Sequence, residues 1–236
     1  MKNNHNSAQR LLEISVFLGL GTMILTYLIS TTSGRVAPFI PIISEMPFNE
    51  PESSIFGTGL GVSIFSFLIL AQVFHRIFND MITNFENKKI WEKRNDLIRI
   101  IASIGAVCGI ITVNFNWNNF PILHGITAFA LFTSFLVWGT FANRIFELSG
   151  QKNKIRQYAV YAGWFFYIAM IIFNGLDGQQ LISEDKDLFY RIDNPPTVDD
   201  ERNNYLNLMA LCEWCMVFSF YTSAITYRKD LEGIQI

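Results

Sequence analysis

Charged residues are absent from several long stretches of this chain. Three of these stretches cover residues 14–34, 53–75 and 100–143. A charged side chain at the centre of a bilayer costs about 3 kcal/mol, and a helix needs about 20 apolar residues to cross the hydrocarbon core. The pattern therefore predicts membrane helices at residues 14–34, 53–75, 98–114, 121–145, 157–176 and 205–227.

The interval from residue 100 to 143 is too long for one membrane helix, and a polar segment divides it. Residues 114–121 read Asn-Phe-Asn-Trp-Asn-Asn-Phe-Pro, with four asparagines and a proline. Asparagine and proline favour turns over helix interiors. Two helices joined by a tight turn fit this interval best.

The composition also points to a membrane protein. Half of the 236 residues are hydrophobic and 16% are charged, against about 25% charged in a typical soluble domain. A soluble bundle of unusually buried helices is the alternative, but the length of the apolar runs favours the bilayer. The first run exceeds the ~7–15 apolar residues of a signal peptide and indicates a membrane anchor. We expect one all-α domain over residues 1–236, an integral membrane bundle of six transmembrane helices.

Lysine and arginine residues are unevenly divided between the two sides of such a bundle. Fourteen of the 18 fall on the side that carries both termini, and only Arg35, Lys186, Arg191 and Arg202 fall on the other. Because cytoplasmic loops carry the excess of basic residues, both termini are predicted to be cytoplasmic. The opposite loops are acidic and should form a lumenal or extracellular cap.

The charge also limits the possible partners. A net charge of −2 and a pI near 5.9 provide no basic surface for nucleic acid, so we expect no nucleic-acid partner. The loop around Trp91 combines Lys89, Lys93 and Arg94 with aromatic residues. Such a loop is either solvated or lies on anionic lipid. The expected partners are membrane lipids, and proteins in the membrane or at the cytoplasmic loops.

Small residues recur four positions apart in three of the expected helices, which is typical of close helix packing in membranes. The pairs are Gly57 and Gly61, Gly105 and Gly109, and Ala159 and Gly163. Cys212 and Cys215 have the spacing of redox and metal motifs, but no histidine cluster accompanies them. We expect these cysteines to serve in packing, and we expect no metal or cofactor.

Glu213 is the one carboxylate deep inside an expected helix, about eight residues or ~12 Å from its start. A charge at that depth is too costly to face lipid, so the side chain should turn inward. His124 begins the fourth helix on the same side, and Asn114 precedes it. We predict that Glu213, His124 and Asn114 meet under the first loop, either as a structural hydrogen-bond network or as a ligand or proton site.

Known catalytic motifs of hydrolases, zinc proteases and nucleotide-binding enzymes do not occur in the sequence. Their absence favours a non-enzymatic protein, and we assign no catalytic residues. A lipid enzyme that uses Glu213 and His124 is the open alternative.

Three separately placed motifs carry a family resemblance. Val113-Asn114-Phe115 followed by His124 resembles an Asn-Phe and His-Asp element, and Cys212-Glu213-Trp214 resembles a Cys-Glu-Trp element. The loop at residues 34–57 resembles a Pro-x-Ile-Ser-acidic, Pro-Glu-Ser, Ile-Phe-Gly pattern, with Pro38, Pro41, Ser44, Glu45, Pro51 and Glu52. Together they resemble the DRAM (damage-regulated autophagy modulator) family, within the FRAG/DRAM/Sfk group of six-span proteins. Gly125 stands here where the family has the aspartate of His-Asp, which weakens a charge-paired site.

The resemblance implies an endomembrane protein, commonly lysosomal, that modulates autophagy. Related branches act in lipid asymmetry and phosphoinositide kinase recruitment at the plasma membrane, or in GPI-anchor remodelling. We expect a regulator of lysosomal or endosomal membranes, with a lipid-remodelling or lipid-translocating protein as the alternative. In the first loop we expect the prolines to stiffen the chain, and Ser44 and Glu52 to cap the second helix.

Overall fold

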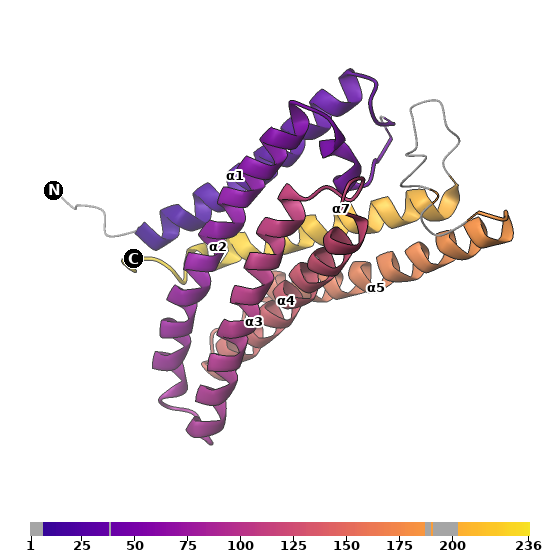
Figure 1. The fold of residues 1–236 in the computed structure, drawn as a ribbon. Coiled ribbons are helices and arrows are strands. Elements are labelled where there is room, and N and C mark those ends of the chain that lie inside the picture. The colour runs from indigo at the N-terminus through magenta and orange to yellow at the C-terminus, as the bar shows by residue number, and fades with distance from the viewer. Residues whose placement is uncertain (1–6, 38, 187–189, 191–202) are drawn as a thin grey trace.

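The structure is a computed structural model, and it describes residues 7–37, 39–186, 190 and 203–236. Six helices within these ranges are long and apolar enough to cross a membrane, as predicted. They are α1 (Ser7–Thr32), α2 (Glu52–Ile82), α3 (Lys88–Asn114), α4 (Pro121–Leu148), α5 (Lys154–Ser183) and α7 (Asn204–Ile225) (Figure 1). Two short 3₁₀ helices, η1 (Ile43–Phe48) and η2 (Thr226–Arg228), lie in the first loop and after α7.

Most of these helices extend beyond the ranges read from the charge-free runs. The largest difference is at residues 76–97, which were expected to lie outside the helices, whereas only residues 83–87 separate α2 from α3. Lysine, arginine and glutamate are good helix formers, and the carboxamide of buried Asn95 binds Asn79 across the hairpin at 2.9 Å. Charge therefore marks the edge of the apolar span, and not the end of the helix.

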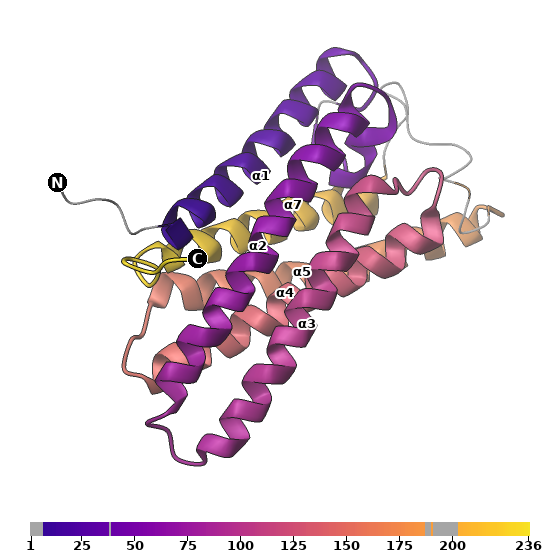
Figure 2. The same cartoon turned by 60° about the vertical axis from the view of Figure 1, so that its left-hand side comes forward.

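The helices form a closed ring in which most chain neighbours are also neighbours in space. Each of α1, α2 and α3 packs along its successor, and α5 packs along α7. The seams between α4 and α5 and between α7 and α1 have fewer close contacts. Figures 1 and 2 show α5 and α7 side by side, and α2 and α3 projecting as a hairpin. Buried aromatic residues such as Phe74, Phe78 and Tyr227 fill the interior.

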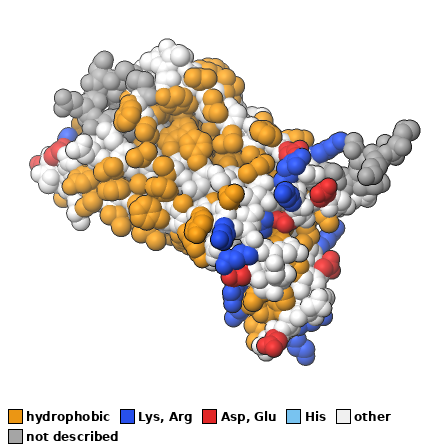
Figure 3. Space-filling model, turned by 180° about the vertical axis from the view of Figure 1, so that it is seen from behind, with side chains coloured by type: hydrophobic (Ala, Val, Ile, Leu, Met, Phe, Trp, Pro, Cys, Tyr) orange, Lys and Arg blue, Asp and Glu red, His pale blue; other side chains and the backbone are white. Residues whose placement is uncertain are grey.

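The two ends of the bundle differ in character. Both termini lie at one end, where the Ala8 N–H donates to the Ile234 carbonyl at 3.3 Å. We call this the termini end, and the end that carries residues 33–51 and 115–120 the first-loop end. Figure 3 shows a broad apolar belt, with lysine and arginine gathered toward the termini end and the hairpin.

The predicted packing glycines lie at helix contacts. A Cβ at Gly109 would lie 2.7 Å from Leu131 of α4, and a Cβ at Gly163 would lie 2.8 Å from Leu136. Gly105 faces Ser134 of α4, Gly57 and Gly61 face Asn114 of α3, and Ala159 is buried. The tight contacts at Gly19 and Gly59 were missed, although each lies four residues from a serine.

Candidate functional site at the first-loop end

Glu213 connects the last helix to the first loop. Its side chain is buried, and its Oε2 accepts a hydrogen bond of 2.7 Å from the backbone N–H of Ile43. This N–H belongs to the first residue of η1, where no intrahelical acceptor exists. The carboxylate therefore turns inward and binds a donor that would otherwise lack a partner.

The residue after Glu213 binds the same loop. Trp214 donates from Nε1 to the Pro41 carbonyl at 2.8 Å, and its ring meets Tyr27 of α1 edge-on. Within the loop, Glu45 Oε2 accepts from the Ile42 N–H at 2.9 Å. Residues 41–43 are thus held by three successive hydrogen bonds, and we call Glu213, Trp214 and Glu45 the loop clamp.

Further contacts tie the first loop to the helices on either side. Arg35 forms an ion pair with the fully buried Glu52 and donates to the Glu50 carbonyl at 2.8 Å. Ser30 of α1 donates to the Met46 carbonyl at 2.9 Å. These bonds fix both ends of the loop between α1 and α2.

The predicted cap of α2 is wrong. Glu50 performs this role: its Oε2 accepts from the Ser54 N–H at 3.3 Å, and its Oε1 accepts from the Ser53 hydroxyl at 2.7 Å. The bonds from Ser54 and Ser53 lower the pKa of the exposed Glu50 carboxyl. Glu52 is instead paired with Arg35, and Ser44 lines a cavity. Pro51 directly precedes α2, whereas Pro38 lies outside the described residues.

His124 closes the turn between α3 and α4. It is buried in the first turn of α4, and its Nδ1 lies 2.8 Å from the Phe115 carbonyl, to which it donates. One turn further along, the hydroxyls of Thr112 and Thr127 bind each other at 2.9 Å. His124 thus joins the start of α4 to the residue that follows α3, just as Glu213 joins α7 to the first loop.

Asn114 does not join this group. Its Nδ2 donates to the Ile110 carbonyl at 2.8 Å, and its Oδ1 would lie 2.8 Å from a Cβ at Gly57. Asn114 is the last residue of α3, and its exposed side chain points toward α2. The expected meeting of Asn114 with Glu213 does not occur in the structure.

A cavity of about 110 Å³, which we call the first-loop cavity, lies beneath the clamp. Glu213, His124, Ser44 and Thr112 contribute polar groups, and most other lining residues are aliphatic or aromatic. Among the described residues, no group of three or more His, Cys, Asp or Glu is placed to hold a metal ion. The arrangement is suited to holding loops and to enclosing an apolar group.

The chain matches a family model along nearly its whole length. The model is described as Frag1/DRAM/Sfk1/Cwh43P N-terminal domain, and it covers residues 8–234. The chain belongs to this family. The three motifs at the first-loop end had indicated the same group, and the protein is an integral multi-pass membrane protein.

Named relatives of this Frag1/DRAM/Sfk1/Cwh43P family member match it in sequence along most of its length. DNA damage-regulated autophagy modulator protein 1 from Xenopus laevis is 26% identical, covering 95% of this chain and 90% of the relative. The Homo sapiens protein of that name is 24% identical, covering 90% of this chain and 86% of the relative. No solved structure matches the chain significantly.

A buried arginine of this family member lies at the termini end. The Arg156 guanidinium binds Asp230 and the Thr226 hydroxyl, the latter at 2.9 Å, and its carbon lies 3.9 Å from the centre of the Tyr227 ring. In the sequence Arg156 stands out only as one of the basic residues on the side of the termini. Its place at the start of an apolar run gave no sign of a partner 74 residues away.

Proposed function

We propose that this protein regulates lysosomal or endosomal membranes and autophagy by presenting an ordered loop, and not by catalysis. The observation that carries the proposal is the use of Glu213 and His124 as backbone ligands. Glu213 accepts from Ile43, and His124 donates to Phe115. The names of the relatives support the autophagy part of the proposal.

A catalytic acid or base must lie within hydrogen-bond reach of a reacting group. Here Glu213 and His124 bind backbone groups next to helix ends, and Trp214 binds the backbone carbonyl of Pro41. What the site offers is a fixed surface formed by residues 33–37 and 39–51. Membrane lipids and membrane proteins on that side are the partners we propose for it.

Autophagic flux in cells that lack the endogenous protein tests the proposal. Trp214→Phe removes the donor to Pro41, whereas the control Trp164→Phe removes an equivalent bond of 2.9 Å to Thr140 between α4 and α5. At equal expression in isolated lysosomes, we expect Trp214→Phe to reduce the flux response and Trp164→Phe to preserve it. An unchanged response in Trp214→Phe, or no protein in the lysosomal fraction, would contradict the proposal.

One observation favours a second candidate, a lipid-remodelling or lipid-translocating protein. Glu213 and His124 both line the first-loop cavity, which lies inside the apolar bundle. Purified protein in liposomes that carry labelled phospholipid and GPI distinguishes the two proposals. Glu213→Gln keeps an acceptor for Ile43 but removes the carboxylate, so lipid turnover or flipping that disappears in this variant would overturn the regulator proposal.

A further inference from the structure

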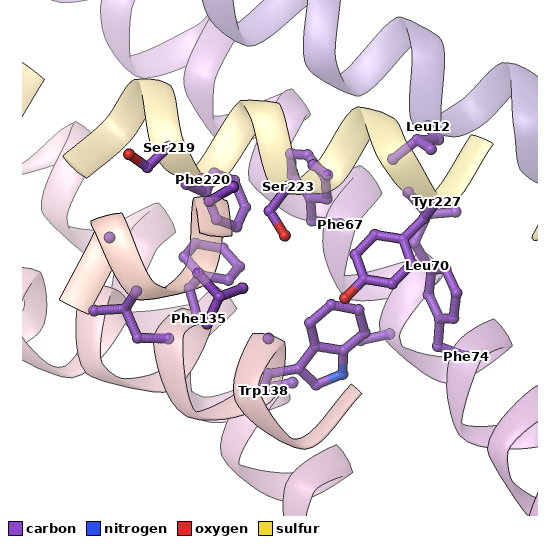
Figure 4. A pocket seen from close by; sticks show the side chains of 18 of the residues that line it. Leu12, Phe67, Leu70, Phe74, Phe135, Trp138, Ser219, Phe220, Ser223 and Tyr227 are labelled. Atoms are coloured by element: carbon purple, nitrogen blue, oxygen red, sulfur yellow. The ribbon is translucent and has the colours of Figure 1, made fainter. Parts of the chain in front are cut away.

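A second cavity, of about 60 Å³, lies in the same interior nearer the termini end. Figure 4 shows Phe220 and Phe135 on one side of it and Tyr227 and Trp138 on the other. Its wall includes Ala159, Val160 and Gly163 of α5, whereas none of the residues lining the first-loop cavity comes from α5. The two cavities thus lie at different depths and share only part of their walls.

Three phenylalanines separate the cavities. Phe67, Phe135 and Phe220 line both of them, as does Leu136, and the three phenylalanines come from α2, α4 and α7. The ring of Phe220 lies 4.3 Å from that of Phe135 and 5.3 Å from that of Phe67, between centroids. All three side chains are partly exposed and line both cavities. We call them the phenylalanine cluster.

The walls of the first-loop cavity favour one kind of occupant. Apolar side chains such as Leu60, Ile64 and Leu131 dominate them, and Glu213 Oε2 and the Thr112 hydroxyl are bonded to protein groups. An apolar cavity offers water few partners, and an empty one forfeits dispersion contacts along its lining. The cavity is not fully enclosed. In a membrane, the apolar belt around the bundle (Figure 3) lies against the hydrocarbon of the bilayer.

We propose that the first-loop cavity binds one hydrocarbon chain of a bilayer lipid, and that the phenylalanine cluster stops this chain short of the second cavity. The cavity has room for the end of one chain only, because a volume of about 110 Å³ is smaller than the ~150 Å³ cavity that admits one benzene ring. The proposal goes beyond a role in autophagy and holds for either proposed function.

Photolabelling of the full-length protein in liposomes tests this site. The probe is phosphatidylcholine with a diazirine at the end of one acyl chain, and labelled residues are assigned by mass spectrometry. We expect label on buried cavity residues such as Leu131 and Met216, in addition to lipid-facing residues such as Ile104. Label restricted to lipid-facing residues would overturn the proposal without any variant.

Two variants separate the cavity from its surroundings. Ala128→Phe fills the first-loop cavity, and we expect it to lower label on Leu131 and Met216 at least fivefold. The control Val107→Phe adds a similar ring at a lipid-facing position of α3, exposed by 52%, and should leave the cavity label unchanged. Equal cavity labelling in both variants would contradict the site.

A third variant tests the phenylalanine cluster. Phe220→Ala should connect the cavities and extend the label to Val160, which is buried and lines only the second cavity. Neighbouring Tyr161, exposed by 56%, reports labelling from outside and should not change. Label at Val160 in the unmodified protein, or no label there in Phe220→Ala, would contradict the stopping role of the cluster.

Discussion

Polar side chains inside this bundle bind backbone groups more often than they bind one another. Glu213 binds the N–H of Ile43, Trp214 binds the carbonyl of Pro41, and His124 binds the carbonyl of Phe115. A buried donor without a partner costs more than an ordinary hydrogen bond contributes. Single polar residues in α7 and α4 therefore stabilise loops that neither helix contains.

Replacing Glu213 tests whether its hydrogen bond or its charge matters for stability. Glu213→Ala leaves the Ile43 N–H buried without an acceptor and should lower the free energy of unfolding by ~1–3 kcal/mol. Glu213→Gln keeps a carbonyl oxygen in place and should lower it by less than ~1 kcal/mol. Thermal unfolding of the detergent-purified variants measures both, and equal losses would show that the charge is the important feature.

The inward direction of Glu213 could be predicted from its depth in an apolar run, but its partner could not. The two groups lie 170 residues apart, and only the packing of α7 against η1 joins them. Asn114 shows the opposite case, because its neighbour in the sequence, Val113, lines the cavity while its own side chain faces Gly57. A shift of one residue on a helix rotates a side chain by about 100°.

At the scale of one helix, α1 carries two glycines in different surroundings. A Cβ at Gly19 would overlap the Tyr221 hydroxyl and lie 2.8 Å from Ser63 Oγ, whereas a Cβ at Gly21 meets nothing within 4 Å. Gly19→Ala should therefore destabilise the protein by ~1–3 kcal/mol through overpacking. Gly21→Ala, two residues away, should be neutral or slightly stabilising. Melting temperatures of the two variants decide the matter, and equal values would refute close packing of α1 with α7.

The start of α5 and the segment after α7 are joined by a buried charge pair. Arg156→Met should cost roughly 3 kcal/mol because it leaves Asp230 without its cation. The exposed pair of Arg144 with Glu147 provides the control, since Arg144→Met should cost less than ~1 kcal/mol. Chemical unfolding in detergent compares the two variants, and similar losses would argue against the buried pair.

The stability of Arg156→Met should depend on pH. Burial raises the pKa of the Asp230 carboxyl, while Arg156 opposes that rise. Without Arg156 the folded state binds the proton more tightly than the unfolded state, so stability increases as the pH falls through the folded pKa. The difference in stability between Arg156→Met and the unmodified protein should therefore become smaller as the pH falls. A deficit that widens with falling pH would contradict this assignment.

At the scale of the whole molecule, both termini share one end with the turns at residues 83–87 and 149–153. The basic residues gather at that end (Figure 3), which predicts that it faces the cytoplasm. On sealed vesicles, a tag after Ile236 should be cut by protease added to the cytoplasmic side, and a tag after Asp185 should be protected. The reverse pattern would show that the orientation is wrong.

The number of membrane helices followed from the apolar runs because each crossing needs its own run. Their arrangement did not follow, since lipid provides no hydrophobic force that selects one helix neighbour over another. The seam between α1 and α7 depends on close fits such as Gly19 against Tyr221. Such fits involve few residues and leave no periodic pattern in the sequence.

The bond between Glu213 and Ile43 also has a consequence for biosynthesis. These residues are separated by 170 positions, which a ribosome covers in roughly 10–35 s at ~5–20 residues per second. During that interval Pro41 and Ile43 have no contact with α7, although α1 to α5 are complete before the interval ends. A chain whose synthesis stops before α7 never acquires the bonds from Glu213 and Trp214 to residues 43 and 41. The order of that loop thus reports whether the ribosome has reached the last helix.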